Sequence, residues 1–462
     1  MDHQKNQIVT VTINDISSNG EGIGKYEGYT LFVKDAIPGD VVKARLTRVK
    51  KNYAFARCEE LITPSSERVE PFCEKNRSCG GCQIQAMSYA AQLDFKQNKV
   101  RNNLTRIGGV PEEIVDGAFE PIIGMTRPER YRNKAQYPIG YDRKGNIVAG
   151  FYAGRTHSII PCTDCRISPE ENRKILETVI AHMRENHIEP YDETTGSGTI
   201  RHVLIRKGFA TGQIMVCLVI RLGGKRHEKQ YIRGQEALTE KLSAISGMTS
   251  VCVSINNENT NVIMGNEIHT IWGKDKIEDV LLGMTFEISP LSFYQVNPIQ
   301  VEKLYGTAIE YAGLTGVEEV YDICCGIGTI AICMSDKAGR VHGLEIVPEA
   351  IEDAKKNAVS NGITNADFIC AAAEEYLPAH KDEIDADMIV LDPPRKGMDE
   401  ASLEAIASAS PKRIVYVSCD SATLARDVKY LRDRGYEVSR IRCVDMFPHT
   451  VHVETVISLS RV

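Results

Sequence analysis

Two short segments near the carboxyl end carry side chains that could do chemistry. Each is an apolar run of strand length that stops in polar and turn-forming residues: residues 389–397, which contain Asp392, and residues 414–420, which contain Cys419. Ligands bind where the strands of an open α/β sheet end, so both side chains are predicted to lie at a ligand site. A thiol placed there can act as a nucleophile. The alternative is a cysteine that is merely a small buried apolar residue.

A third segment has the same form. Residues 320–330 read as a strand followed by Gly326-Ile-Gly328 and the start of a helix, and those glycines would let the backbone approach a ligand closely. Glu345 ends the next predicted strand about 20 residues later, where an acid accepts hydrogen bonds from ribose hydroxyls. The alternative for Glu345 is an acid that caps the helix starting near Pro348.

These strand ends need a sheet to hold them. Strands are predicted at 319–324, 341–345, 366–370, 386–391, 413–418, 435–444 and 452–459, with helices between the early ones, such as residues 348–361. This alternation predicts a parallel sheet with right-handed crossovers. If the last strand runs antiparallel beside the fifth, Glu454 at its start faces Cys419. The alternative is an exposed acid, the ordinary environment of glutamate.

The chain has 14 cysteines and no apolar signal segment at its start, so a disulfide framework is not expected. Five of them cluster in sequence as Cys73, Cys79 and Cys82, followed much later by Cys162 and Cys165. This spacing is typical of metal or cluster binding. From spacing alone, the first interpretation is zinc on Cys79, Cys82, Cys162 and Cys165.

Residues 1–62 read as a small β domain of five short strands, which suggests an OB-like barrel of the kind that often binds nucleic acid. Residues 19–24 and 37–40 have turn chemistry. From residue 43 to 57 every charged side chain is basic: Lys43, Arg45, Arg48, Lys50, Lys51 and Arg57. Together with Tyr53 and Phe55 they suit phosphate neutralisation and base stacking, although a solvated strand face is the alternative.

Residues 63–290 form a predicted central region. Residues 86–107 read as a helix with Lys96, Lys99 and Arg101 exposed, and β-like runs follow at 200–205, 213–220 and 250–255. Arg132, Lys134 and Arg201 stand among polar and aromatic residues, as in a phosphate-contacting surface or a solvated edge. His202 is interpreted as a core or surface histidine rather than a catalyst.

Length and composition set outer bounds. A chain of 462 residues suggests two or three domains, and 42% hydrophobic with 25% charged residues is ordinary for a globular protein. No stretch reaches the length of a membrane span, so a cytoplasmic protein without membrane partners is expected. The formal net charge of −7 means that any basic nucleic-acid surface must be local.

Four motifs together resemble the RNA uracil-5-methyltransferase family, which uses S-adenosylmethionine. They are Asp-Pro-Pro-Arg-Lys-Gly at 392–397, Ser-Cys-Asp at 418–420, Ser-Phe-Tyr-Gln-Val-Asn at 292–297 and His-Val-Glu-Thr at 452–455. The resemblance covers essentially the whole chain. It implies an α/β fold in three parts: a TRAM-like RNA-binding barrel (1–62), a central α+β domain with the cysteines (63–290) and a class I, Rossmann-like methyltransferase domain (291–462).

The resemblance also implies roles for individual residues. Cys419 would be the nucleophile that adds to carbon 6 of uracil, and Glu454 the general base. The implied cofactor contacts are Gln295, Cys324, Glu345 and Asp392, where Cys324 replaces an aromatic residue usual in the family. A 4Fe-4S cluster is implied on Cys73, Cys79, Cys82 and Cys165, with Cys162 as a surplus thiol. Arg132 and Lys134 would contact RNA.

The predicted activity is therefore methylation of carbon 5 of a specific uridine in 23S ribosomal RNA by a monomeric enzyme. The barrel and the cysteine cluster favour ribosomal RNA over transfer RNA. Three alternatives stay open: a transfer-RNA uracil-5-methyltransferase, a methyltransferase acting on another base, and a non-catalytic RNA-binding iron-sulfur protein.

Overall fold

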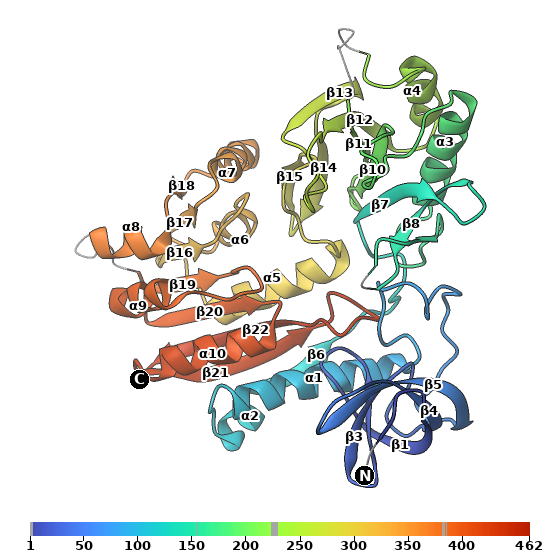
Figure 1. The fold of residues 1–462 in the computed structure, drawn as a ribbon. Coiled ribbons are helices and arrows are strands. Elements are labelled where there is room, and N and C mark those ends of the chain that lie inside the picture. Colours follow the sequence, from blue (N-terminus) through green and yellow to red (C-terminus); the bar gives the residue numbers. More distant parts are fainter. Residues whose placement is uncertain (1–2, 155, 223–229, 381–383, 385) are drawn as a thin grey trace.

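The amino-terminal part of the protein is a closed β-barrel. The computed structural model describes residues 3–154, 156–222, 230–380, 384 and 386–462 (Figure 1). The barrel strands follow the order β1-β2-β3-β5-β4. Their bounds are β1 (Ile8–Ile16), β2 (Gly22–Tyr26), β3 (Tyr29–Lys34), β4 (Val41–Val49) and β5 (Tyr53–Thr63). The predicted five-stranded OB-like barrel is confirmed, with alternate side chains such as Val9, Val11 and Ile13 filling its interior.

One predicted turn of the barrel is partly strand. Residues 22–24, expected to be in a turn, begin β2. Added Cβ atoms at Gly22 and Gly24 would lie 2.7 Å from the Ala36 carbonyl oxygen and 2.5 Å from that of Thr12. The glycines therefore serve close approach of neighbouring strands rather than chain reversal.

The central part is a seven-stranded sheet in the order β13-β12-β11-β10-β7-β8-β9. Its strands are β7 (Lys134–Tyr141), β8 (Ile147–Tyr152), β9 (Ile159–Pro161), β10 (Ile200–Lys207), β11 (Ile214–Ile220), β12 (Met248–Ile255) and β13 (Glu267–Gly273). The apolar sides of α3 (Glu171–Glu185) and α4 (Gln235–Ser243) pack against it in one core. A hairpin of β14 (Ile277–Leu281) and β15 (Met284–Ile288) leads into the last part.

The carboxyl-terminal part is an eight-stranded sheet in the order β18-β17-β16-β19-β20-β22-β21-β6. Its strands are β6 (Phe119–Ile123), β16 (Glu319–Ile323), β17 (Arg340–Glu345), β18 (Ala366–Cys370), β19 (Met388–Leu391), β20 (Arg413–Ser418), β21 (Tyr436–Val444) and β22 (Glu454–Arg461). The helices are α5 (Pro298–Ala312), α6 (Thr329–Met334), α7 (Pro348–Ser360), α8 (Ala373–Ala379), α9 (Glu400–Ala409) and α10 (Ser421–Arg432). β16 to β20 pair in parallel, and β22 runs antiparallel between β20 and β21, as predicted.

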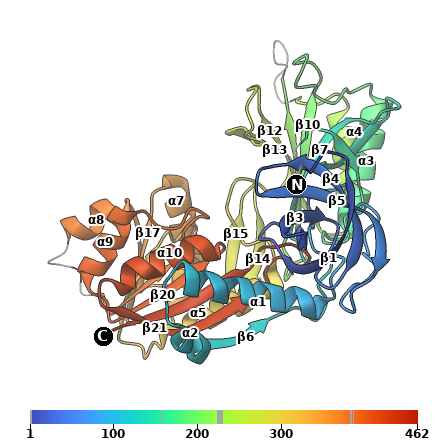
Figure 2. The ribbon, with the colours of Figure 1, turned by 60° about the horizontal axis from the view of Figure 1, so that its bottom comes forward.

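Residues 89–123 pack on this same sheet although they precede the central one. Figure 2 shows α1 (Tyr89–Arg106) lying along the carboxyl-terminal sheet, and α2 (Glu112–Ala118) adjoins it. β6 completes the sheet by pairing in parallel with β21. Among the helices of the described residues, none combines the length and apolar character that a bilayer span needs.

Candidate active site

The ends of three neighbouring strands bring the predicted catalytic residues together. Asp392 follows β19, Cys419 follows β20, and Glu454 is the first residue of β22. The antiparallel register pairs Ser418 with Thr455, so Cys419, just after β20, and Glu454, at the start of β22, lie at the same edge. The neighbour relation expected between the fifth and last strands is therefore confirmed.

The environment of this edge raises the pKa values of its acidic groups. Burial, together with the charges of Glu454 and Asp392, raises the pKa of the Cys419 thiol to about 12. Burial also raises the pKa of Glu454 well above its ordinary value, with Asp392 adding to the effect. Arg395, from the Asp-Pro-Pro-Arg motif, opposes both shifts. The groups at this edge can therefore exchange protons once a substrate or cofactor changes the local charge.

Glu454 is available for such a role. Its side chain is buried, with 2% of the residue exposed, and its Oε2 atom has no hydrogen-bond partner within the residues that the structure describes. A buried carboxyl oxygen without a partner is costly, so its retention fits a group whose partner is a ligand.

Asp392 sits between the catalytic edge and the predicted cofactor residues. Its pKa is raised to about 7 by burial, against hydrogen bonds from Tyr305 and Gln295. The Tyr305 hydroxyl, on α5, lies 3.3 Å from Asp392 Oδ2. Asp322 on β16 is also buried, its Oδ2 accepts from the Ala331 amide at 3.0 Å, and its Oδ1 has no partner among the described residues. Sequence reasoning missed Tyr305 and Asp322, although a carboxylate inside an apolar strand was a usable signal for Asp322.

The glycine turn after β16 forms a cradle. Gly328 has φ = 79°, and an added Cβ would lie 2.8 Å from the Phe368 ring. Cys324 also has a positive φ, of 67°, and is half-buried, which raises its pKa to about 12 and keeps the thiol neutral. Backbone amides at such a turn can approach a ligand closely.

Glu345 lies at the end of β17 beside that turn. One carboxylate oxygen accepts from the Gly326 amide at 3.2 Å, and the other from the Ile346 and Val347 amides at 2.9 and 3.0 Å. These contacts support the interpretation of Glu345 as an acid that caps the helix starting near Pro348. Its contact with a ribose stays a prediction. This arrangement fits an adenosyl cofactor: the glycine turn can approach it closely, Glu345 lies where the ribose would bind, and Asp392 lies where the amino-acid end would bind.

The segment that precedes Glu454 is fixed by buried contacts to α1. Lys96 Nζ lies 2.5 Å from Asp445 Oδ1 and 3.0 Å from the Phe447 carbonyl oxygen, and both side chains of this ion pair are fully buried. The Tyr89 hydroxyl donates to the other Asp445 oxygen at 2.8 Å. The prediction that Lys96 is exposed was wrong, because helical periodicity does not show that a lysine has a buried acid to meet. The pair helps to hold residues 445–453, and hence Glu454, in place.

The five clustered cysteines lie near one another without forming a metal-binding group. Their charges interact across the three chain segments, and the interaction with the Cys162 thiol lowers the pKa of Cys165. Yet no three His, Cys, Asp or Glu side chains within the described ranges are arranged to hold a metal ion. The structure thus gives no support to the 4Fe-4S ligands predicted at Cys73, Cys79, Cys82 and Cys165, nor to the zinc set.

Some of the basic side chains between residues 43 and 57 of the barrel are paired with acids, so fewer of them can contact phosphate than the sequence suggests. Lys43 pairs with Glu60 at 2.8 Å, and Arg45 and Arg57 both pair with Glu59. These acids lie on β5, just beyond the stretch read as purely basic. Arg48, Lys50 and Lys51 are exposed and have no ion pair among the described residues. They lie near an aromatic group formed by Phe32, Tyr53 and Phe55.

A second basic group lies beside the loop that carries Gln295. Arg206 is buried and donates to the carbonyl oxygens of Pro290 and Ser292, the latter by a very short contact. Lys134 is its cross-strand neighbour, and burial with the charges of Arg206 and Arg132 lowers the pKa of Lys134 to about 7. Arg132 and Lys134 therefore do flank the candidate cofactor loop, while Arg206 was not singled out from the sequence.

Comparison with known proteins agrees with this architecture. Residues 88–462 match the tRNA (uracil-5-)-methyltransferase family, and residues 3–58 match the TRAM domain. An RNA methyltransferase of Clostridium tetani is 45% identical over 458 residues, covering 99% of this chain and 97% of its own. Another, from Halalkalibacterium halodurans, is 46% identical over 454 residues, covering 98% and 96%.

A solved structure matches across all three parts. The Pyrococcus abyssi tRNA (uracil-54, C5)-methyltransferase, in complex with S-adenosyl-L-homocysteine, is 26% identical, with a TM-score of 0.75. The match covers 98% of this chain and 100% of that one, so it includes the barrel. The predicted α/β methyltransferase fold with an amino-terminal TRAM barrel is thereby confirmed. The barrel cannot, however, distinguish a ribosomal from a transfer-RNA enzyme.

Proposed function

Because this chain belongs to the tRNA (uracil-5-)-methyltransferase family, we propose that it transfers a methyl group from S-adenosylmethionine to carbon 5 of a uridine in structured RNA. The observation that carries the proposal is the placement of Cys419 and Glu454 at adjacent strand ends, with one buried Glu454 oxygen that lacks a partner in the described structure. Uracil C5 methylation needs both a nucleophile and a later base. Methylation of an exocyclic amine needs no cysteine nucleophile.

Carbon 5 of uracil is a poor nucleophile, and no base can simply deprotonate it. After losing its proton, Cys419 adds through Sγ to carbon 6, and the electrons of the C5=C6 double bond move into an enolate. A bound S-adenosylmethionine would supply its sulfonium methyl group to carbon 5, and its S–CH3 bond would break to release S-adenosylhomocysteine. Glu454 removes the carbon 5 proton, the double bond re-forms, and the Sγ–C6 bond breaks to release Cys419. Covalent addition thus divides one hard step into easier ones.

The remaining residues take positioning roles in this proposal. Gln295, Cys324, Glu345 and Asp392 hold the cofactor, with Tyr305 supporting Asp392 by its hydrogen bond. The half-buried Cys419 thiol is protonated at neutral pH, since its pKa is about 12. Its activation must accompany substrate binding, when the charges around Glu454, Asp392 and Arg395 change. This keeps the free enzyme from reacting with other electrophiles.

A covalent trap tests this mechanism. RNA containing 5-fluorouridine should form a complex with the wild-type protein that survives denaturing electrophoresis, because fluorine cannot leave carbon 5 as a proton does. Cys419→Ala should form no complex, and Cys443→Ala, at a buried cysteine on β21, should form it normally. A stable complex with Cys419→Ala would show that another group is the nucleophile.

The proposed RNA is 23S ribosomal RNA, as predicted from the sequence, acted on by a monomer in the cytoplasm. Transfer RNA is the second candidate, favoured by the structural likeness to the Pyrococcus abyssi tRNA enzyme. Unmodified 23S RNA and transfer RNA should be incubated separately with the protein and mapped for 5-methyluridine by mass spectrometry. Methylation of 23S RNA alone supports the first candidate, and methylation of transfer RNA alone supports the second.

The iron-sulfur cluster remains a separate hypothesis, carried by the family resemblance of the cysteine motif. Protein purified without oxygen should be brown and contain about four irons per chain if a four-thiolate cluster is present. Cys165→Ser should lose the iron and Cys162→Ser should keep it. Stoichiometric zinc, or no metal at all, would contradict the hypothesis.

A further inference from the structure

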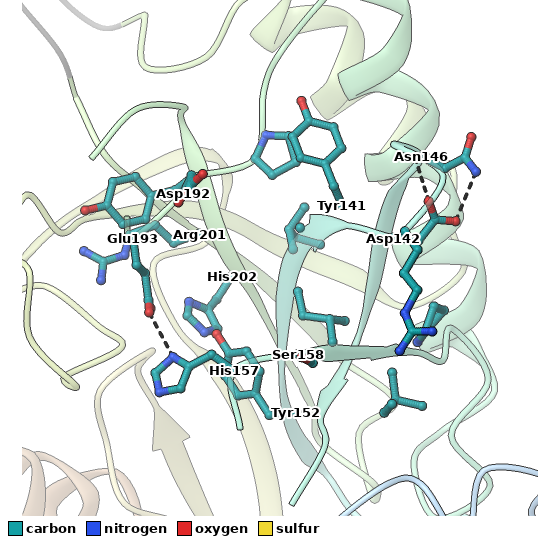
Figure 3. Close-up of a pocket in the computed structure, with 18 of the residues that line it drawn as sticks. Tyr141, Asp142, Asn146, Tyr152, His157, Ser158, Asp192, Glu193, Arg201 and His202 are labelled. Atoms are coloured by element: carbon teal, nitrogen blue, oxygen red, sulfur yellow. Dashed lines mark hydrogen bonds and ion pairs between the residues drawn. The ribbon is translucent and has the colours of Figure 1, made fainter. Parts of the chain in front are cut away.

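A cavity of about 800 Å³ lies in the central part of the protein, separate from the catalytic strand ends (Figure 3). The β7–β8 hairpin, β9, residues 190–194 and the start of β10 enclose it, and none of its lining residues belongs to the candidate active site. Its volume lies in the range of sites that bind small organic groups. Of its lining residues, Arg201 and His202 were singled out from the sequence, and no cavity was predicted there.

His202 provides an unsatisfied polar group at the centre of this cavity. The residue is 5% exposed, and neither ring nitrogen has a hydrogen-bond partner within the described residues. Figure 3 places the ring between Arg201 on one side and Tyr152 and His157 on the other. Burial lowers the pKa of His202 to about 4, so the ring is neutral and offers one donor and one acceptor. A ligand with complementary groups would remove the cost of burying both unpaired.

The surroundings of His202 favour a flat, uncharged ligand. The rings of Tyr152 and His202 meet edge to face at 6.4 Å, and the Arg201 guanidinium lies 4.6 Å from the centre of the Tyr191 ring. Arg201 is held by the carbonyl oxygens of Asn256 and Glu258 at 3.0 and 2.6 Å. Three acidic residues balance three basic ones on the lining: Asp142, Asp192 and Glu193 against Arg143, Lys144 and Arg201. Such a lining does not select a phosphate, whereas aromatic rings with a neutral donor and acceptor match a nucleobase.

We propose that this cavity binds an unpaired nucleobase of the RNA substrate, at a position other than the methylated uridine. β10 connects the two places: His202 lies near its start and Arg206, which holds the Pro290 and Ser292 carbonyls before Gln295, lies near its end. Four strand residues at about 3.3 Å each put roughly 13 Å between them. RNA that reaches the candidate active site past the half-buried Lys134 can therefore place a neighbouring base in the cavity. The inference rests on the proposed function, because it takes RNA as the substrate.

Kinetics of a His202→Ala variant test the inference with RNA as the probe. The KM for unmodified 23S RNA (or transfer RNA, whichever is methylated) should rise roughly tenfold, as for loss of one base contact. The kcat and the KM for S-adenosylmethionine should not change. His202→Gln, which keeps a donor and an acceptor, should restore most of the affinity. His187→Asn, at an exposed histidine of the same domain outside the cavity, is the matched control.

Ultraviolet crosslinking gives a readout that does not depend on catalysis. Irradiation of the complex, followed by nuclease and protease digestion, should yield a single nucleotide attached to a peptide containing Tyr141, Tyr152 or Tyr191. Tyr141 is 51% exposed, so Tyr141→Ala can reduce this crosslink without disturbing the core if His202→Ala fails to fold.

Crosslinks confined to the barrel and the catalytic domain, with unchanged KM in the His202 variant, would overturn the inference. So would saturable binding of free adenosine or uridine monophosphate that RNA does not displace, since the cavity would then be a small-molecule site. If the protein makes no 5-methyluridine but still forms crosslinks at the cavity, the proposed function is contradicted and the nucleobase site is still supported.

Discussion

At the residue scale, the charge of Asp392 influences the protonation of Cys419 and Glu454 because the three side chains share one edge of the sheet. The pKa of each is raised by burial, and Asp392 raises the pKa of both others. Arg395 is the cation that opposes these shifts at Cys419 and Glu454. Proton transfer at this edge is therefore expected to depend on which ligand, if any, occupies it.

Glu454→Gln should stop the reaction after methyl transfer. The amide cannot remove the carbon 5 proton, while Cys419 can still form its bond to carbon 6. A methylated, covalently bound RNA should accumulate with ordinary uridine substrate and appear as a slow band on a denaturing gel. Bases contribute on the order of 10² to 10⁴ in rate, so residual turnover is allowed. Wild-type turnover would mean that another group or a water is the base.

The raised pKa of Asp392 predicts a pH-dependent cost in stability. Its folded-state pKa of about 7 lies above the ordinary value of about 3.9, so the unfolded chain loses its proton first as the pH rises. Stability is therefore lost between about pH 4 and pH 7, by up to about 4 kcal/mol for a shift of about three units. Asp392→Asn removes this loss. The unfolding temperature of the variant minus that of wild type should be larger at pH 8 than at pH 4.5. An equal difference at both pH values would contradict the assignment.

At the element scale, the catalytic edge depends on segments that are far from it in sequence. α1 and β6 precede the central sheet but pack on the carboxyl-terminal one. The backbone of His449 is part of that packing. Its amide donates to Gln92 Oε1 at 2.9 Å, and its carbonyl oxygen accepts from the Gln83 and Ile84 amides. The turn between β21 and β22 is thus held by the region around α1, and this fixes where β22 begins.

Lys96→Ala should show how much this support is worth. The substitution leaves the Asp445 carboxylate buried without its cation, which typically costs about 3–5 kcal/mol. Thermal unfolding should shift to a lower temperature, and kcat should fall because Glu454 is less well positioned. The double variant Lys96→Met, Asp445→Asn keeps an acceptor for Tyr89 and removes both charges, so it should recover most of the stability. An equally unstable double variant would mean that packing by the lysine stem, not charge, was lost.

At the scale of the whole molecule, an acidic protein must bind an acidic polymer. The formal net charge is −7, and three of the six basic residues between positions 43 and 57 are paired with Glu59 or Glu60. Two local surfaces carry cations that have no ion pair among the described residues: Arg48, Lys50 and Lys51 on the barrel, and Arg132 and Lys134 beside the cofactor loop. RNA affinity should therefore depend on these two surfaces.

Neutralising Lys50 and Lys51 to Gln should weaken RNA binding and flatten the slope of log affinity against log salt by roughly 1 to 2, because two phosphate contacts are lost. Filter binding at several salt concentrations measures the slope. Lys43→Gln, at a lysine already paired with Glu60, is the matched control and should change the slope little. A double variant with the wild-type slope would mean that RNA does not reach this side of the barrel.

The sequence by itself determined the order of elements and the candidate chemistry. Strand-length apolar runs ending in Asp392 and Cys419 specify a β/α alternation, because residue periodicity and turn chemistry are local properties of the chain. The same local reasoning placed Glu454 at the start of the last strand. Local sequence was therefore sufficient to place all three residues at strand ends.

Only the tertiary structure decided which distant groups meet. Lys96 is buried because Asp445, 349 residues away, lies against it, and no helical periodicity encodes that partner. Likewise Lys43 and Arg45 meet acids of the next strand through the register of β4 and β5, and His202 lines a cavity assembled from four segments. Burial and pairing of charged side chains depend on long-range packing, so the protonation of the site and its RNA-facing surfaces could not be read from local sequence.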